Sequence, residues 1–187
     1  MPTVAANTSG RIALEIDGAD PVFASTVTPP ILSFAADGAP TLGEFEASVN
    51  LSEAGALLDW VMALPRRKVV ESAGAVLVAN HNLDVQRRID WIAGVVTRLS
   101  LGTLDARDAK RTMAMSVTWW APNVTHGKGG GRLASSSLKR RKAWLSANFR
   151  PKLGDLPIAP SQVVKVELPT VSAKVGGPGE THDAAVV

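Results

Sequence analysis

The chain has 187 residues, of which 45% are hydrophobic and 20% are charged, and its formal net charge is +3. This length and composition suit one folded domain with appended segments, and the small net charge does not imply nucleic acid for the chain as a whole. The lack of cysteine excludes disulfides, thiolate metal sites and thiol nucleophiles. No apolar run reaches the roughly 20 residues that cross a bilayer, and the N-terminus lacks the order of a signal peptide. We therefore expect a globular protein with no membrane segment and no secretory signal.

Alternation of apolar and polar residues predicts strands in the first part of the chain. Residues 1–10, rich in small and polar side chains, are expected to be a flexible lead. Residues 11–17 alternate up to the turn signal Asp17-Gly18, and residues 45–51 alternate in the same way. Two half-buried strands are predicted at these places.

After residue 51 the apolar residues change from alternate spacing to helical spacing, which predicts one short helix. Ser52 can cap its start, and Pro65 is expected to end it. The apolar residues at helical spacing are Leu57, Trp60, Val61 and Leu64. These residues are most simply core.

Further strands are predicted at residues 74–79 and 86–96, paired around Asn80-His81-Asn82, and at residues 111–120, where the alternation is cleanest. Short strands around one helix favour closure, because closure removes exposed strand edges. The expected fold is mainly β, a β-barrel or rolled antiparallel sheet with one bracing α-helix, over residues 11–122.

Beyond Pro122 the composition changes three times. Residues 123–147 are predicted to be a basic arm rich in glycine and serine, residues 148–168 an additional strand pair, and residues 169–187 a flexible tail. Positive charge gathers between residues 126 and 150, where no acidic residue occurs. The basic side chains of that stretch are Lys128, Arg132, Lys139, Arg140, Arg141, Lys142 and Arg150.

Three further features of the sequence invite a chemical interpretation. The glycine-rich residues 127–132 lack the spacing of a phosphate-binding loop, so a linker is favoured. The histidines His81, His126 and His182 fall in predicted turns or tails, so no metal site, cofactor or catalytic residue is expected and the chain is not predicted to be an enzyme. The basic cluster with Trp144 favours docking on an acidic neighbour, and nucleic-acid binding by residues 128–142 is the alternative.

A series of motifs in residues 11–120 resembles the tail tube family of contractile phages, contractile injection systems and the type VI secretion tube. These motifs are Leu57-Leu58-Asp59-Trp60, Gly74-Ala75-Val76-Leu77-Val78, Arg88-Ile89-Asp90-Trp91 and Leu104-Asp105-Ala106, followed by a closing alternating strand. Residues 142–150 and 153–157, with the valine-rich strand up to Glu167, resemble a subset of phage tail proteins in which a second tube-like half follows. In this chain a low-complexity segment follows Leu168 instead.

The resemblance implies a structural subunit that forms stacked, six-membered rings around a conduit for DNA or effector proteins. Its partners would be further copies of itself, the sheath, baseplate or terminator proteins of the same apparatus, and the cargo in the lumen. Its place would be the tail tube of a virion or injection particle assembled in the host cytoplasm, and a cap or adaptor ring is the alternative. The candidate subunit or ring contacts are Trp119, Trp120, Lys139, Arg140, Arg141, Lys142 and Trp144.

Overall fold

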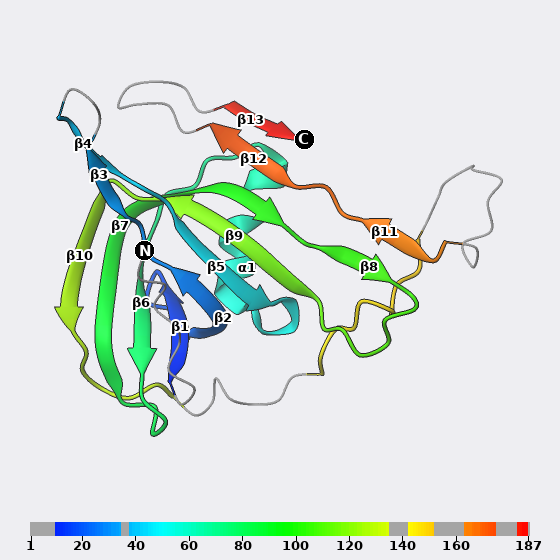
Figure 1. Ribbon diagram of the computed structural model, residues 1–187, viewed down its shortest axis with the longest axis horizontal. Helices are drawn as coiled ribbons and strands as arrows, with labels where there is room; N and C mark the ends of the chain where they lie inside the picture. The colour runs from blue at the N-terminus through cyan, green and yellow to red at the C-terminus, as the bar shows by residue number, and fades with distance from the viewer. Residues whose placement is uncertain (1–9, 35–37, 135–141, 152–162, 175–182, 187) are drawn as a thin grey trace.

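The computed structural model describes residues 10–34, 38–134, 142–151, 163–174 and 183–186 (Figure 1). Within these ranges the chain is mainly β with a single α-helix, so the predicted fold class is confirmed. The strands are β1 (Arg11–Ile16), β2 (Val22–Thr28), β3 (Leu32–Phe34), β4 (Pro40–Leu42), β5 (Phe45–Asn50), β6 (Ser72–Ala79), β7 (Val85–Ser100), β8 (Thr103–Asp105), β9 (Ala114–Trp120), β10 (Asn123–Lys128), β11 (Lys165–Glu167), β12 (Val171–Lys174) and β13 (Asp183–Val186). The helical segments are α1 (Gly55–Val61) and the 3-10 turns η1 (Leu51–Glu53) and η2 (Leu64–Arg66).

The main sheet closes into a barrel. β7, β6, β1, β2, β5 and β9 are neighbours in that order, and β9 pairs back onto β7. Every neighbouring pair is antiparallel. Closure leaves these strands without a free edge over their paired residues, which is the reason that the sequence favoured a barrel.

β7 is long enough to hold four partners. β9 and β10 follow one another along one edge of it, because Trp120 lies opposite Val95 and Asn123 lies opposite Ile92. β6 and β12 are its other partners, at residues 72–79 and 171–172 respectively. A positive φ of 55° at Ala93 marks the bend between the two halves of β7.

An aromatic cluster fills the barrel interior. Trp119 stacks on Phe45 with ring centroids 4.8 Å apart and an interplanar angle of 2°. Trp91 lies 5.2 Å from Trp119, and Trp60 of α1 lies 6.4 Å from Trp91. α1 is therefore held to the barrel by the stripe of apolar residues that the helical spacing predicted.

Two glycines make room for the ring of Trp91. A Cβ atom on Gly94 would lie 2.7 Å from the Trp91 ring, and one on Gly74 would overlap that ring and the Glu15 carbonyl oxygen. Neither position can hold a larger residue without displacing the indole. The glycine that opens the predicted strand at residue 74 thus has a packing role.

A second, smaller cluster lies on the outside of β1 and β6. Its buried members are Ala13, Ala75, Leu77, Ala79, Leu83, Val85 and Leu133. The strap, which we define as residues 129–133, crosses the end of the β6–β7 hairpin. The Gly129 N–H donates to the Gln86 carbonyl at 3.0 Å, and the Leu133 N–H donates to the Leu83 carbonyl at 2.9 Å. The strap places the Leu133 side chain over this cluster.

The helix begins and ends differently from the prediction. Asn50, not Ser52, is the capping residue, since its Oδ1 accepts hydrogen bonds from the Ser52 N–H at 3.2 Å and from Ser52 Oγ at 2.8 Å. This cap starts η1, and α1 follows without a side-chain cap. α1 ends at Val61, and Pro65 lies inside η2 where the missing N–H costs nothing.

Segments expected to be loops add strands to the sheet. Residues 123–128, predicted as the start of a surface arm, form β10 and pair with β7. Residues 171–174 and 183–186, predicted as parts of a flexible tail, form a hairpin whose first strand joins β7, and Val171 is buried. These segments hold too few apolar residues to fold alone, but an existing strand edge supplies their hydrogen-bond partners.

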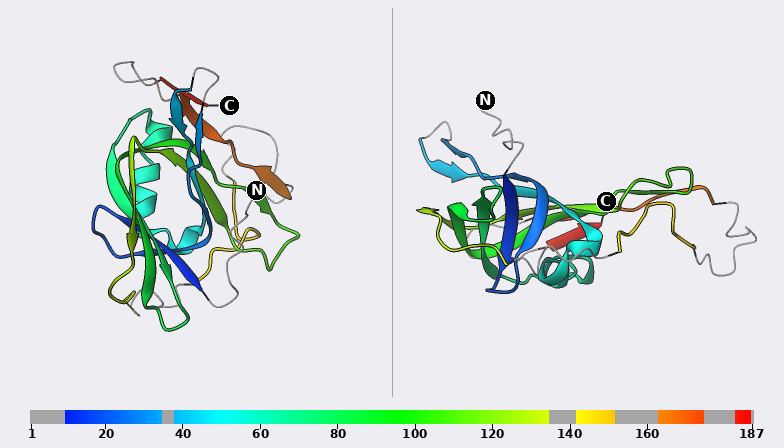
Figure 2. Two further views of the ribbon diagram at one scale, coloured as in Figure 1. Left: turned by 60° about the vertical axis from the view of Figure 1, so that its left-hand side comes forward. Right: turned by 90° about the horizontal axis from the view of Figure 1, so that it is seen from below.

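The structure describes only part of residues 148–168, where a strand pair was predicted. β11 is a strand, but its described partner is β8, through the pair Val166 and Leu104. Residues 149–151 are not in a strand, and residues 152–162 lie outside the described ranges. Figure 2 shows the β8–β11 pair extending away from the barrel.

Candidate assembly surfaces

The adjacent residues Trp119 and Trp120 point to opposite faces of β9, as the alternation predicted. Trp119 is fully buried in the aromatic cluster, and its Nε1 has no hydrogen-bond partner among the described residues. It therefore offers no surface to a neighbouring subunit. Trp120 is half-buried on the outer face, so it is the member of the pair that we keep as a candidate contact.

The β3–β4 hairpin carries a concentration of exposed apolar side chains. Ile31 is 67% exposed, Leu32 57% and Phe34 69%. The hydroxyls of Ser33 and Thr41 lie 2.7 Å apart and join the two strands of the hairpin. Figure 1 shows the hairpin projecting beyond the barrel. The exposed apolar surface therefore stands on a paired, ordered element.

The described part of the basic arm separates into a bound section and an exposed one. The strap holds its first section to the hairpin of β6 and β7, with Arg132 Nε donating to the Asn82 carbonyl at 2.9 Å. Lys139, Arg140 and Arg141 lie outside the described residues. Lys142 is exposed, and the Trp144 side chain is 53% exposed.

Backbone hydrogen bonds attach the Trp144 segment to the barrel. The Met113 N–H donates to the Trp144 carbonyl at 2.7 Å, and the Ser146 N–H donates to the Arg111 carbonyl at 2.8 Å. Ser146 is buried, and its Oγ donates to the Asp108 carbonyl at 3.1 Å. The exposed Trp144 ring is thus presented from a fixed backbone.

An ion-pair network lies on the outer face of β1 and β7. Arg88 Nη2 lies 3.0 Å from Glu15 Oε1, and Arg88 Nε lies 2.6 Å from Asp90 Oδ1. The hydrogen bonds to Asp90, and then to Glu15, raise the pKa of Arg88 above its ordinary value. The Arg88 side chain is 37% exposed, so solvent screens the network and its contribution to stability is about 1 kcal/mol at most. The Arg88 and Asp90 of the family-like motif therefore join β7 to β1.

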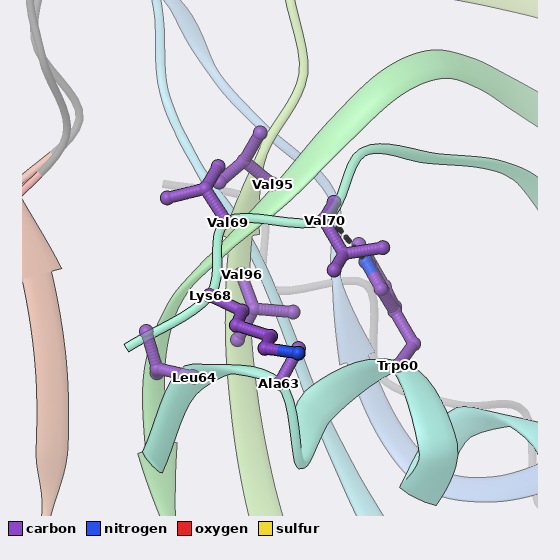
Figure 3. Close-up of a pocket in the computed structure, with 8 residues that line it drawn as sticks. All are labelled: Trp60, Ala63, Leu64, Lys68, Val69, Val70, Val95 and Val96. Carbon is purple, nitrogen blue, oxygen red and sulfur yellow. Dashed lines mark hydrogen bonds between the residues drawn. The ribbon is translucent and has the colours of Figure 1, made fainter. Parts of the chain in front are cut away.

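One small cavity lies between α1, η2 and β7 (Figure 3). Its volume is about 10 Å³, enough for a single water molecule at most. Trp60 Nε1 donates to the Val70 carbonyl at 2.9 Å on one side of it. The remaining lining residues are Ala63, Leu64, Lys68, Val69, Val95 and Val96. This cavity cannot admit an organic substrate.

The described residues contain no cluster of three or more side chains suited to bind a metal ion. His81 and His126 are exposed, and His182 lies outside the described ranges. None of the helices in those ranges is long and apolar enough to span a membrane.

No protein-family model matches the chain, and no curated protein matches it in sequence. Solved structures that are similar to it include Hcp proteins and components of contractile injection systems. Hcp1 from Flavobacterium johnsoniae is 12% identical with a TM-score of 0.48, over 65% of this chain and 98% of that one. Hcp1 from Salmonella typhimurium is 10% identical with a TM-score of 0.48, over 65% of this chain and 87% of that one.

A chain from the anti-feeding prophage cap is 15% identical with a TM-score of 0.47, over 68% of this chain and 94% of that one. These proteins belong to the class that the sequence motifs resemble.

Sequence reasoning missed the hairpin surface. The run from Pro29 to Phe34 contains three large apolar residues, but it alternates too briefly to show whether they face a core or solvent. The prolines and the nearby Asp37-Gly38 pair were the only signal, since they mark a turn outside the main sheet.

Proposed function

We propose that the chain is a structural subunit of a phage-type tail or injection-system inner tube. In this function it assembles into six-membered rings that stack around a conduit for DNA or effector proteins. The observation that carries the proposal is the exposed apolar surface of Ile31, Leu32 and Phe34 on the projecting hairpin. The partners that this function requires are further copies of the chain, the sheath, baseplate and terminator proteins, and the cargo. Its place is the tail tube of a particle assembled in the host cytoplasm.

The hairpin suits contact with a second copy for two reasons. Large apolar side chains grouped on a surface mark contact sites, because burying them against a partner removes them from water. The hairpin also projects from one end of the β2–β5 pair, so it reaches a neighbour without distorting the barrel. Head-to-tail contacts of this kind generate closed rings or open stacks, according to the rotation between copies.

The assembly is tested by negative-stain electron microscopy of the purified chain, with mass measurement in solution. We expect rings or stacked tubes with six-fold symmetry. In the double variant Leu32→Ser with Phe34→Ser we expect these to disappear while circular dichroism shows an intact fold. The matched control is Val69→Ser, which removes an apolar side chain that is 39% exposed on the loop after η2 and should leave assembly unchanged.

Two results would contradict the proposal. One is a chain that remains monomeric at every concentration and in the presence of its sheath and baseplate partners. The other is a double variant that assembles as well as the parent chain.

The exposed Trp144 beside Lys142 favours a second candidate, nucleic-acid binding by the basic arm. A solvent-facing indole can stack on a base while the cationic side chains neutralise phosphates. In that function the chain would bind single-stranded DNA with an affinity that falls steeply as salt rises. A salt titration of DNA binding by the intact chain tests this candidate, and binding that is absent at low salt would contradict it.

A further inference from the structure

Two segments that are far apart in the sequence meet beside the barrel. A β-bridge between Thr112 and Leu145 joins residues 105–112 to residues 142–150. The backbone hydrogen bonds described above for the Trp144 segment hold the same two stretches together. We name these two stretches, residues 105–112 and 142–150, the cationic lobe.

The cationic lobe holds an excess of positive charge. Asp105 Oδ1 accepts a hydrogen bond from the Arg107 N–H at 2.9 Å. Asp108 Oδ1 accepts one from the Arg111 N–H at 3.1 Å. These two carboxylates therefore hold backbone turns, and neither forms an ion pair within the described part of the chain. The exposed cations of the lobe, which also lack an ion-pair partner among the described residues, are Arg107, Lys110, Arg111, Lys142 and Arg150.

Apolar surface lies beside these cations. The Trp144 side chain is 53% exposed and that of Val164 is 43% exposed. Val164 borders the lobe, because its carbonyl accepts a hydrogen bond from the Ala106 N–H at 2.9 Å. Aromatic residues and arginine are enriched in protein interfaces, where apolar side chains are removed from water. The cationic lobe therefore suits a partner that presents both negative charge and apolar side chains.

The β3–β4 hairpin of the same chain presents this combination. Its exposed apolar side chains are described above. The Gly43 N–H donates to the Ile31 carbonyl at 2.9 Å, so Glu44 directly follows the base of the hairpin. Glu44 and Glu46 are exposed on either side of the buried Phe45, and neither forms an ion pair among the described residues. We name the hairpin together with Glu44 and Glu46 the hairpin end.

Charge is segregated in the same way along the chain. Residues 12–65, which include the hairpin end, contain no lysine, arginine or histidine. Residues 109–154, which include most of the cationic lobe, contain no aspartate or glutamate. The right-hand view of Figure 2 shows the hairpin at one end of the molecule and residues 142–151 toward the other. The two surfaces therefore do not neutralise each other within one copy, and both are available to neighbours.

We propose that the hairpin end of one copy docks on the cationic lobe of the next copy. This proposal rests on the proposed function, in which the hairpin is a contact between copies, and it names the surface that the hairpin meets. In this contact the apolar side chains of the hairpin cover Trp144 and Val164. Glu44 and Glu46 lie against the lysine and arginine side chains of the lobe.

Charge also determines how the copies are oriented. Two hairpin ends brought together would juxtapose acidic groups, and two lobes would juxtapose cationic groups. Like charges across an interface oppose binding, so a two-fold contact of either surface with itself is disfavoured. The contact between unlike surfaces is head-to-tail, which is the kind that closed rings and open stacks require.

The other occupant of suitable charge is a single-stranded nucleic acid, the second candidate above. Its phosphates would neutralise the cations and a base could stack on Trp144. The exposed Val164 side chain gains nothing from either group. A second copy is favoured because the hairpin end supplies apolar and acidic side chains together.

Charge reversal tests the contact. The hairpin variant carries Glu44→Lys with Glu46→Lys, and the lobe variant carries Lys110→Glu, Arg111→Glu and Lys142→Glu. In either variant alone both surfaces have the same sign, so we expect the concentration needed for assembly to rise by roughly 100-fold or more. An equal mixture of the two variants should assemble near the concentration of the parent chain, since every contact then joins opposite charges again. Mass measurement in solution and negative-stain electron microscopy follow the assembly.

The matched control reverses three exposed cations outside the lobe, with Arg66→Glu, Lys68→Glu and Arg87→Glu. It changes the net charge by the same amount as the lobe variant does. We expect it to assemble as the parent chain does, and circular dichroism checks the fold of every variant.

A reversed variant that assembles at the concentration of the parent chain would overturn the contact and leave the proposed function standing. A lobe variant that assembles normally but no longer binds a single-stranded DNA oligonucleotide would assign the lobe to nucleic acid instead. The contact is also wrong if the folded variants do not assemble when mixed, or if the control loses assembly, because net charge would then govern association. A parent chain that forms no assembly at all would overturn the proposed function and the contact together.

Discussion

At the scale of single residues, Trp119 and Trp120 show how β9 divides two environments. One indole lies in a stacked cluster with Phe45, and its neighbour lies half-buried on the opposite face. The cluster leaves Nε1 of both Trp91 and Trp119 without a hydrogen-bond partner among the described residues. Such a group costs about 1–3 kcal/mol, so the packing of the rings must outweigh that cost.

We predict that the two tryptophans of β9 differ in their effect on stability. Trp119→Ala leaves a cavity in the aromatic cluster and should lower the free energy of unfolding by about 3–5 kcal/mol. Trp120→Ala removes a half-buried ring and should lower it by about 1–2 kcal/mol. Urea denaturation followed by circular dichroism measures both values. Equal losses would show that Trp119 is not central to the core.

The alternation of residues 113–120 was enough to predict which residues share a face of β9, but not which face is the core. Which face is buried depends on the neighbouring strands. Val117 lies opposite Leu99 because of the register between β9 and β7, which the local sequence does not show. The pairing of Ser48 with Ser116 across β5 and β9 could not be predicted for the same reason. Ser48 and Ser116 are far apart in sequence, and no local pattern indicates that they are opposite one another.

At the scale of elements, the bend in β7 and the strap explain two of the differences between the predicted and observed structure. The bend at Ala93 changes the phase of the alternation, so the sequence predicted a strand ending near residue 96 where β7 continues to Ser100. The glycines after residue 126 resembled a linker because they have no side chains to show a period. Their backbones nevertheless pair with the β6–β7 hairpin.

We predict that neighbouring glycines of the strap tolerate substitution differently. A Cβ atom on Gly129 would overlap the Val85 carbonyl oxygen, whereas one on Gly130 would meet nothing within 4 Å. Gly129→Ala should therefore lower the free energy of unfolding by about 1–3 kcal/mol, and Gly130→Ala should change it by about 0.5 kcal/mol or less. Thermal and urea unfolding of both variants provide the comparison. Equal losses of unfolding free energy in the two variants would show that the strap is not attached to the barrel.

At the scale of the whole molecule, the exposed features occupy separate regions. The apolar hairpin lies at one end of the β2–β5 pair, the exposed cations Arg66, Arg67 and Lys68 lie at and after η2, and the Arg88 ion-pair network lies on the outer face of β1 and β7. Figure 2 shows that the hairpin and the β8–β11 pair extend beyond the barrel in different directions. A subunit with two such extensions can reach two different neighbours.

The basic cluster supplies a prediction that separates assembly from nucleic-acid binding. Replacing Lys139, Arg140, Arg141 and Lys142 together by glutamine removes four positive charges without adding apolar surface. If the arm docks on an adjacent subunit, as we expect, electron microscopy should show rings lost or shortened. Intact rings together with lost salt-dependent DNA binding would instead support the nucleic-acid candidate.

The distribution of tryptophans also determines the optical properties of the molecule. The chain has five tryptophans and no tyrosine, so the indoles dominate its near-ultraviolet emission. Trp60, Trp91 and Trp119 are close enough to exchange excitation energy, and their emission reports on the integrity of the barrel core. Trp144 is exposed to solvent, and its emission reports on the surface. One unlabelled protein can therefore reveal unfolding through the buried rings and burial of the arm, as subunits associate, through the exposed one.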